Sequence, residues 1–287
     1  MKGFFHITLV ISLKYWCFIY GEEPFIKGHI MAQFGNQLFQ IAATTSLALD
    51  HGAKAIFPEL KSSQEFNIPL NYAHVFSHLN TDEPSVPISV EYKEPHFHFT
   101  PIPYQPNMQL FGWFQSEKYF KHHKKEILEL FAPSKEILSY LESKYAKIIA
   151  HPKTVAVHIR TYKDTTPEFH PFVGWHYIYK ALQQFGKDHL FVVFSDDITF
   201  CKRKMKKIGL GSSIIFIEGN KHFQDLYLIS LCKHAIISNS SFSWWGAYLN
   251  QNPDKIIIAP SPKRWFGPGL HYCDTKDILP QEWKVLF

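Results

Sequence analysis

The fold of this chain is decided by the stretch Ala235-Ile236-Ile237-Ser238-Asn239-Ser240-Ser241-Phe242-Ser243-Trp244-Trp245-Gly246-Ala247-Tyr248-Leu249. Residues 235–238 are largely apolar and predict a buried strand, whereas residues 242–249 predict a helix. A serine-rich turn joins the two. A strand that runs directly into a helix through such a turn is the repeating unit of an α/β fold.

The same alternation extends through the second half of the chain. Apolar runs predict strands at residues 155–159, 190–194, 214–217 and 255–259, and helical patterns separate them at residues 175–185, 198–208 and 224–232. Strands of this kind alternating with helices indicate a doubly wound, mostly parallel sheet. Ligands of such sheets bind at the carboxyl ends of the strands, so the residues that follow each strand are candidates for a site.

The first half opens as a β–α–β unit. Residues 25–30 and 53–57 predict strands, and residues 38–50 predict a helix that ends at Gly52. Residues 58–110 predict irregular structure with short strands, because their prolines exclude long helices.

Two further helices are predicted before the midpoint of the chain. They cover residues 117–130 and 134–148, and Ser134 is suited to cap the second. We therefore expect two α/β domains, formed by residues 25–150 and 151–287.

Composition narrows the classes of protein. The chain has 287 residues, of which 46% are hydrophobic, enough for one large or two ordinary globular domains. Four cysteines without a CxxC pair are too few for a disulfide scaffold and argue against a structural zinc site. The net charge of +5 suits a phosphate-bearing ligand or an anionic membrane surface and falls short of that of a dedicated nucleic-acid binder, so we expect no nucleic-acid partner.

Residues 1–24 differ from the rest of the chain. Residues 3–20 are mostly apolar, behind Lys2 and interrupted by Lys14. A basic start and an apolar core fit a secretory signal, but the cleavage site is poor and the stretch is slightly short for a spanning helix. An uncleaved anchor, a cleaved signal, a membrane-skimming segment and an ordinary apolar extension remain open, with membrane association as our expectation.

Small hydroxyl groups and a positive charge follow two of the predicted strands. Ser240 and Ser241 can face an anion at a helix N-terminus, although a serine in this place can also simply cap the helix. Arg160 follows the strand at 155–159 and is suited to hold a phosphate, with an interdomain salt bridge as the alternative. His158 lies two residues earlier, where strand geometry can place it on the same face.

Acidic and amide residues follow two other strands. Asp196-Asp197 could bind a metal ion, but adjacent strand residues point in opposite directions, so we favour a helix N-cap and expect no metal. Gly35-Asn36-Gln37 lacks the spacing of the common phosphate loops, and its amides suit sugar or phosphate oxygens. A cleft between the two halves would then hold two substrates, as in a two-domain sugar-nucleotide transferase, with a nucleotide hydrolase as an alternative.

Taken together, these segments resemble the α-1,2-fucosyltransferase family, glycosyltransferase family 11. The resemblance rests, in chain order, on Phe34-Gly35-Asn36-Gln37-Leu38-Phe39-Gln40, on residues 155–160, 194–197, 225–230 and 239–246, and on residues 277–280 with Trp283. It covers about residues 26–287, and the serine–tryptophan block at 239–246 is its most specific part. The family implies a GT-B-like fold, in which two Rossmann-type domains face a cleft. The domain at residues 25–150 is then expected on the acceptor side, and the domain at residues 151–287 is expected to bind GDP-fucose.

The resemblance also implies a reaction. GDP-fucose is the implied donor, a terminal β-galactoside of a glycan is the acceptor, and transfer inverts the fucose anomeric carbon without a metal. Arg160 is matched to the donor pyrophosphate. The other implied donor-binding residues are His158, Asp225, Asn239, Ser240, Ser241 and Phe242, and the implied cleft-lining residues are Gly35, Asn36 and Gln37. The expected location is a membrane, on the cytoplasmic side in a bacterium or in the Golgi of a eukaryote.

The sequence departs from the family pattern after Arg160. Thr161-Tyr162-Lys163-Asp164 stands where a second arginine and Gly-Asp-Tyr are usual, and Ala32-Gln33-Phe34 replaces Gly-Gly-Leu. We expect Arg160 to stabilise the departing GDP, and Glu168 or Asp164 to take the acceptor proton, although either acid could be an ordinary surface residue. A transferase for another nucleotide sugar and a catalytically silent carbohydrate-binding protein remain alternatives.

Overall fold

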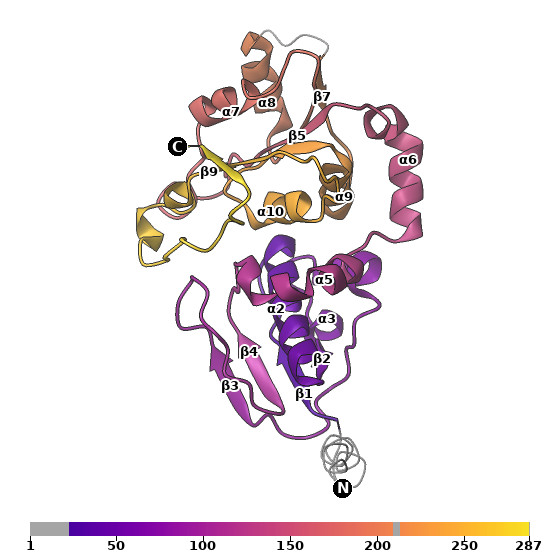
Figure 1. Ribbon diagram of the computed structural model, residues 1–287, viewed down its shortest axis with the longest axis vertical. Coiled ribbons are helices and arrows are strands. Elements are labelled where there is room, and N and C mark those ends of the chain that lie inside the picture. The colour runs from indigo at the N-terminus through magenta and orange to yellow at the C-terminus, as the bar shows by residue number, and fades with distance from the viewer. Residues whose placement is uncertain (1–22, 209–212, 287) are drawn as a thin grey trace, which may run out of the picture.

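The computed structural model describes residues 23–208 and 213–286, which form two lobes (Figure 1). The apolar segment at residues 3–20 lies outside the described residues, so its membrane association stays a prediction. Within the described ranges, no helix combines the length and apolar character that crossing a membrane requires.

The N-terminal lobe, at the bottom of Figure 1, contains a four-stranded parallel sheet in the order β2-β1-β4-β3. Its strands are β1 (Phe25–Gly28), β2 (Lys54–Ile56), β3 (Val90–Lys93) and β4 (Met108–Phe111). Helix α2 (Phe34–His51) connects β1 to β2 and ends at Gly52, whose left-handed backbone (φ 60°) confirms the predicted stop. The helix begins four residues earlier than predicted, because its first turn packs against the other lobe.

The segment between β2 and α6 is irregular, as the prolines predict, but it contains short helices. These are α3 (Glu59–Ser62), α4 (Ile68–Asn71), a π-helical turn (Tyr72–Phe76) and α5 (Lys124–Leu130). The prediction of one helix over 117–130 is wrong: residues 117–119 and 121–123 form 3-10 turns, and the extended φ of Phe120 (−145°) interrupts the helix. Phe120 turns away from a helical path and is fully buried, with its ring stacked on Trp245 of the other lobe.

Helix α6 (Lys135–Ile149) leads from the first lobe to the second (Figure 1). Ser134 caps it as predicted, because its Oγ accepts a hydrogen bond from the Ile137 amide at 3.3 Å. The backbone leaves helical geometry at Tyr145. The predicted domain boundary near residue 150 falls just after this helix and stays a prediction.

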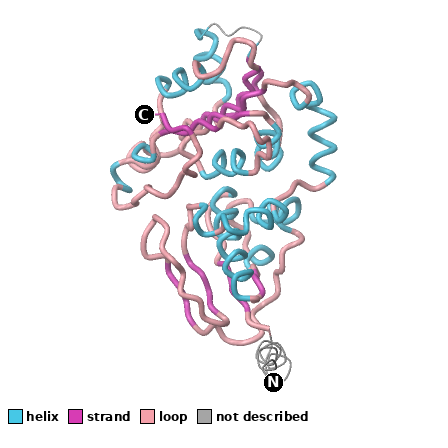
Figure 2. The backbone as a smooth tube through the Cα atoms, in the orientation of Figure 1, coloured by secondary structure: helices cyan, strands magenta, loops and turns pink. Residues whose placement is uncertain are grey.

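The C-terminal lobe contains a six-stranded parallel sheet in the order β10-β9-β8-β5-β6-β7. Five of its strands match the predicted alternation, and the short C-terminal strand was not predicted. The strands are β5 (Thr154–Ile159), β6 (Leu190–Ser195), β7 (Ile214–Phe216), β8 (His234–Ile236), β9 (Ile257–Pro260) and β10 (Lys284–Leu286). Figure 2 shows that the chain between β9 and β10 is mainly loop.

Helices cover both faces of this sheet, which confirms the doubly wound prediction. Val155 and Val157 share one apolar cluster with α7 (Trp175–Leu182) and α8 (Ile198–Met205). Ala156, which points to the opposite face, belongs to the cluster that includes α9 (His222–Leu231) and α10 (Ser241–Tyr248).

The two lobes share an apolar contact between α2 and α10. The ring of Phe39 lies 4.5 Å from that of Trp244 and 5.1 Å from that of Trp245, and neither tryptophan has exposed surface. The contact belongs to a continuous hydrophobic core that reaches into both lobes. It sets the N-terminal ends of α2 and α10 against each other, where the polar residues of both strand–helix turns lie.

Candidate functional site

Arg160 lies at the carboxyl end of β5, between the ends of β6 and β8. Its backbone N–H donates to Ser238 Oγ at 2.9 Å, which ties the end of β5 to the end of β8. Its guanidinium lies 3.3 Å from Asp196 Oδ2 and 5.1 Å from the ring centroid of Tyr162. The side chain is 39% exposed, so one edge of the cation is paired and the rest is accessible to an anion.

Asp196 and Asp197, which follow β6, have different structural roles. Asp197 caps α8, because its Oδ1 accepts from the Phe200 amide at 2.9 Å, as predicted for one of the pair. Asp196 accepts from the amide of Thr161 at 2.7 Å and from that of Tyr162 at 3.1 Å. Asp196 therefore holds the turn that carries Arg160, a role that sequence analysis missed although the two residues end neighbouring strands.

The serine turn lies beside Arg160, between β8 and α10. Ser240 occupies the N-cap position, yet its side chain makes no capping bond. Ser241 Oγ donates to Asn36 Oδ1 of the other lobe at 2.8 Å. Asn239 is 1% exposed, and its Nδ2 donates to the carbonyls of Pro171 and Trp265, so it braces the turn from behind.

His158 lies beneath this turn. It is 6% exposed, and its ring centroid lies 5.4 Å from that of Phe242. Burial, reinforced by the nearby Arg160 charge, lowers the pKa of His158 to about 3, so the imidazole is neutral at physiological pH. Its buried Nδ1 has no hydrogen-bond partner among the described residues.

Asp225 lies on α9 and is linked to the connecting helix α6. Its Oδ1 accepts from Asn220 Nδ2 at 2.9 Å, and burial raises the pKa of Asp225 to about 6. Asn220 Oδ1 in turn accepts from the hydroxyls of Tyr140 and Tyr145, each at 2.9 Å. The structure thus joins Asp225 to α6 through Asn220, and within the described ranges Asp225 forms no ion pair with Arg160.

The N-terminal lobe presents Gly35 and Asn36 to the serine turn. A Cβ atom on Gly35 would lie 2.5 Å from the Phe242 amide nitrogen and 2.6 Å from the Ser241 carbonyl carbon, so only glycine fits. Asn36 Oδ1 accepts from Gln115 Nε2 at 2.9 Å as well as from Ser241.

Gln37 has a different environment from its two neighbours. It has no exposed surface, its Nε2 donates to the Ala32 carbonyl at 2.7 Å, and its Oε1 accepts from Asn71 Nδ2 at 2.7 Å. Asn71 Oδ1 is 2.5 Å from His222 Nε2 of α9. Gln37 therefore braces the first turn of α2 from inside, which differs from the cleft-lining place expected for it.

Strained backbone concentrates around these turns. Of six non-glycine residues with positive φ in the described ranges, five are in loops of this region: Ala32, Phe66, Asn67, Phe114 and Tyr162. Residues in left-handed geometry cost free energy and tend to persist at functional sites, where surrounding contacts hold them in place. The hydrogen bonds of Gln37 to Ala32 and of Asp196 to Tyr162 are contacts of this kind.

The two candidate bases lie on the exposed loop between β5 and α7. Neither Asp164 nor Glu168 forms an ion pair with any residue in the described ranges. The loop is nevertheless anchored, because the Glu168 carbonyl accepts from the Gly269 amide at 2.8 Å and the Phe169 carbonyl accepts from Gly267 at 2.9 Å. The structure places Glu168 next to the 267–269 turn rather than in contact with Arg160.

Glu94, just after β3, is a partly buried carboxyl that sequence analysis missed. Its Oε2 accepts from the amides of Trp113 and Phe114 at 2.7 and 3.0 Å, and its Oε1 accepts from the Tyr119 hydroxyl at 3.1 Å. Burial raises the pKa of Glu94 to about 7 despite these donors. Nothing in the sequence indicates that a strand ends just before this residue, since β3 lies in the proline-rich segment, which has no clear periodicity.

One group of side chains in the described ranges has the proximity needed to hold a metal ion. It consists of Asp50, His122 and His123, and both imidazoles hydrogen-bond to the Asp50 carboxylate. Asp50 is near the C-terminal end of α2, whereas Asn36 is near its N-terminal end, about 21 Å away for a straight helix. The cluster is thus separate from the serine turn.

The chain is similar to known glycosyltransferases. The family model described as "Glycosyl transferase family 11" matches residues 29–284. An alpha-1,2-colitosyltransferase from Escherichia coli is 34% identical over 185 residues, which is 62% of each chain. Galactoside alpha-(1,2)-fucosyltransferase 2 from Oryctolagus cuniculus is 24% identical over 247 residues, covering 80% of this chain and 68% of the relative. The chain spans less than two thirds of the length of the two E. coli relatives it matches.

Solved structures show the same architecture. The fucosyltransferase NodZ from Bradyrhizobium superposes with a TM-score of 0.54 at 14% identity, covering 79% of this chain and 92% of NodZ. A NodZ alpha-1,6-fucosyltransferase soaked with GDP-fucose gives a TM-score of 0.55 at 13% identity, covering 85% and 97%. This likeness, together with the two parallel sheets, confirms the predicted GT-B-like fold class.

Proposed function

The chain belongs to glycosyl transferase family 11, and from this premise we propose that it transfers L-fucose from GDP-fucose to a hydroxyl group of a terminal galactoside, forming an α-1,2 linkage. Relatives named as alpha-1,2-transferases and galactoside fucosyltransferases support the linkage and the acceptor class. A structural neighbour soaked with GDP-fucose supports the donor.

The proposal rests mainly on one observation. Arg160 and the serine turn of the C-terminal lobe lie beside Gly35 and Asn36 of the N-terminal lobe. Arg160 keeps an accessible cationic edge beside the N-terminus of α10, where helix dipole and free amides favour negative charge. The diphosphate of GDP would bind here, with Ser240 facing it and with Ser241 Oγ exchanging its hydrogen bond to Asn36 for one to a phosphate oxygen. His158, neutral and buried beside Phe242, and Asp225 on α9 are proposed to contact the nucleoside.

The reaction follows from this placement. An acceptor oxygen forms a bond to the fucose anomeric carbon from the face opposite the diphosphate, while the bond from that carbon to the phosphate oxygen breaks. The electron pair leaves with GDP, whose negative charge Arg160 and the α10 N-terminus stabilise. The hydroxyl proton passes to a carboxylate, for which Glu168 and Asp164 are the candidates. Because Arg160 and the helix supply positive charge, we propose that no metal is required.

A donor and acceptor screen tests the proposal. GDP-fucose and lactose are incubated with the full chain in the presence and absence of EDTA, GDP release is followed, and the product linkage is determined by NMR. Thermal shifts with GDP, UDP and CMP are compared, because a ligand of the native state raises the unfolding temperature by mass action. A shift with UDP or CMP and none with GDP would contradict the proposal.

Transfer of a different sugar is a second candidate, because one relative is named a colitosyltransferase. The two candidates share the nucleotide site and differ in the sugar. Competition between GDP-fucose and the corresponding colitose donor, followed by mass spectrometry of the product, distinguishes them. A protein that binds lactose but releases no GDP from either donor would instead be a carbohydrate-binding protein.

A further inference from the structure

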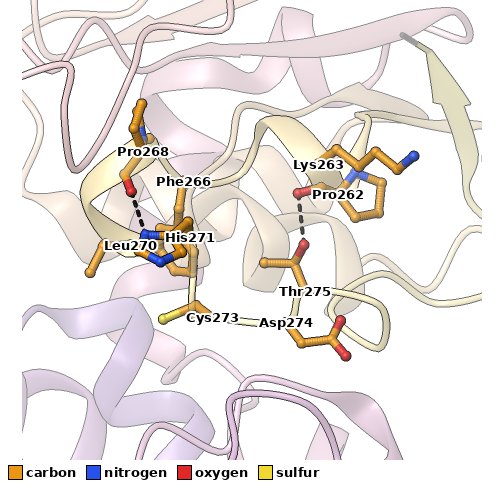
Figure 3. A pocket seen from close by; sticks show the side chains of 10 residues that line it. Pro262, Lys263, Phe266, Pro268, Leu270, His271, Cys273, Asp274 and Thr275 are labelled. Atoms are coloured by element: carbon orange, nitrogen blue, oxygen red, sulfur yellow. Dashed lines mark hydrogen bonds between the residues drawn. The ribbon is translucent and has the colours of Figure 1, made fainter.

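A pocket of about 520 Å³ lies in the loop-rich chain between β9 and β10 (Figure 3). Its lining combines the apolar side chains of Phe266 and Leu270 with the polar side chains of His271, Asp274 and Thr275. None of the residues assigned above to the donor lines it. The volume falls within the range of small-molecule sites, roughly 300–1,000 Å³.

The pocket lies at the seam between the lobes. The ring of Phe97, from the loop after β3, meets the ring of Phe266 at 5.0 Å and 74°. His98 Nδ1 lies 3.4 Å from Asp274 Oδ2. A ligand in the pocket would therefore lie beside both lobes, as the second substrate of a two-lobed transferase must.

A row of rings connects the pocket to the donor edge. The guanidinium of Arg160 lies over Tyr162, whose ring stacks on His170 at 5.3 Å and 15°. His170 in turn lies 5.7 Å from Phe266, which lines the pocket. The pocket and the proposed diphosphate site thus flank one continuous aromatic row.

The candidate base Glu168 is attached to the same wall. A Cβ atom on Gly267 would lie 2.3 Å from the carbonyl oxygens of Pro167 and Glu168, so the pocket wall and the Glu168 loop pack without space between them. The Gly269 amide donates to the Glu168 carbonyl at 2.8 Å. An acceptor in this pocket would have its hydroxyl groups near the loop that carries the proposed base.

The chemistry of the lining fits an uncharged sugar ring. An aromatic face packs against the C–H face of a pyranose, while imidazole and carboxylate groups accept hydrogen bonds from its hydroxyls. His271 Nδ1 is 2.9 Å from the Pro268 carbonyl, which can only accept a hydrogen bond. In the neutral tautomer that satisfies this contact, Nδ1 carries the hydrogen and Nε2 has a lone pair for a ligand hydroxyl. The charges at the pocket are mixed, because Lys263 lines it together with Asp274, and Lys276 Nζ lies 3.0 Å from Asp274 Oδ2.

We propose that this pocket is the acceptor subsite and that it takes the terminal galactoside ring, with Phe266 against the ring face and His271 and Asp274 on its hydroxyls. The inference rests on the proposed function and adds to it where the acceptor binds. It assigns acceptor recognition to the C-terminal lobe rather than only to the N-terminal one.

Two variants test the subsite kinetically. His271→Ala removes one hydrogen-bond acceptor, and Leu270→Trp fills the pocket. Tyr272→Ala is the matched control, since Tyr272 is adjacent, 71% exposed and not part of the lining. With GDP-fucose and lactose, we expect the KM for lactose to rise about 10-fold in His271→Ala, the value of one lost hydrogen bond, and further in Leu270→Trp. The KM for GDP-fucose and the control should stay within about two-fold of the parent.

A measurement on the unmodified chain gives an independent result. Cys273 lines the pocket, whereas Cys201 and Cys232 are buried. N-ethylmaleimide labelling of the Cys273 peptide, followed by mass spectrometry at mildly alkaline pH, should be slowed by lactose and not by GDP. Unchanged KM values together with labelling that lactose does not slow would overturn the subsite while leaving transfer intact. A parent that neither releases GDP nor binds it would refute the proposed function, and the subsite with it.

Discussion

In the N-terminal lobe Gln37 lies in the first turn of the helix that follows β1, and its amide has no exposed surface. In the C-terminal lobe Arg160 directly follows β5, and its side chain is 39% exposed. Both residues are polar, and both stand at the carboxyl edge of a parallel sheet. The Gln37 amide is satisfied by Ala32 and Asn71 of its own lobe, while Arg160 has only Asp196 as an ion-pair partner in the described part. Polar residues near the ends of strands thus identify the functional edge of a sheet. Among them, only the residues whose polar atoms are not all bonded within the protein are available to a ligand.

Removing the exposed cation should have the largest effect. In Arg160→Ala we expect transfer from GDP-fucose to fall about 100-fold or more, because a charge-stabilising donor at a developing anion contributes about 2.7–4 kcal/mol. GDP release under saturating lactose measures the rate, and circular dichroism checks the fold. Lys163→Ala is the control, since Lys163 is the exposed cation three residues away. Activity of Arg160→Ala within a few-fold of the parent would remove Arg160 from the proposed site.

Disturbing the contact between the two lobes at Gly35 should have the next largest effect. Gly35→Ala places a methyl group 2.5 Å from the Phe242 amide nitrogen, which is backbone and cannot yield without moving α10. We expect the free energy of unfolding in urea to fall by about 1–3 kcal/mol, the usual cost of overpacking. Gly52→Asn provides the comparison, because Gly52 has open space around it and asparagine tolerates its left-handed backbone. Equal stability of the two variants would show that the lobes do not depend on this contact.

Replacing the buried amide tests the other side of the comparison. Gln37→Met keeps the side-chain length but leaves Asn71 and the Ala32 carbonyl without their partner. We expect a loss of about 1–3 kcal/mol in unfolding free energy, since buried polar groups then lack hydrogen bonds. The KM for GDP-fucose should change less than about two-fold, because Gln37 has no exposed surface with which to contact a ligand. A large rise in that KM with unchanged stability would place Gln37 in the site.

The smallest effect concerns pH. Burial raises the pKa of Asp225 from 3.8 to about 6, so the native state retains a proton that the unfolded state has lost. The contribution of this group to stability therefore falls as the pH rises between about 4 and 6 and is constant above, by at most about 3 kcal/mol in total and by less where solvent screens the partly exposed carboxylate. Asp225→Asn keeps an acceptor for Asn220 and should abolish this part of the pH dependence. Urea unfolding at several pH values measures the difference, and parallel curves for parent and variant would contradict the assignment.

Much of the architecture was predictable because it depends on local pattern. Apolar runs separated by helical periodicity predicted five strands of the second sheet, and Gly52 and Ser134 end and begin their helices as expected. These features depend on residues close together in the chain, where side-chain periodicity and capping act directly. Short strands were expected within residues 58–110, but the position of β3 was not predicted. The 3-10 turns at 117–123 were missed, because the conformation there depends on the contact of Phe120 with the distant Trp245.

The sequence by itself determined the fold class, the family and the edge at which polar residues gather. The tertiary structure alone decided which of those residues remain available: it buried Gln37, used Asp196 to hold the Arg160 turn, and paired Ser241 with Asn36 from the other lobe. The physical reason is that a polar group's hydrogen-bond partners come from segments far away in sequence, and only packing brings them within bonding distance. Residue type sets what a side chain is able to bind, and its neighbours in space set whether it is free to do so.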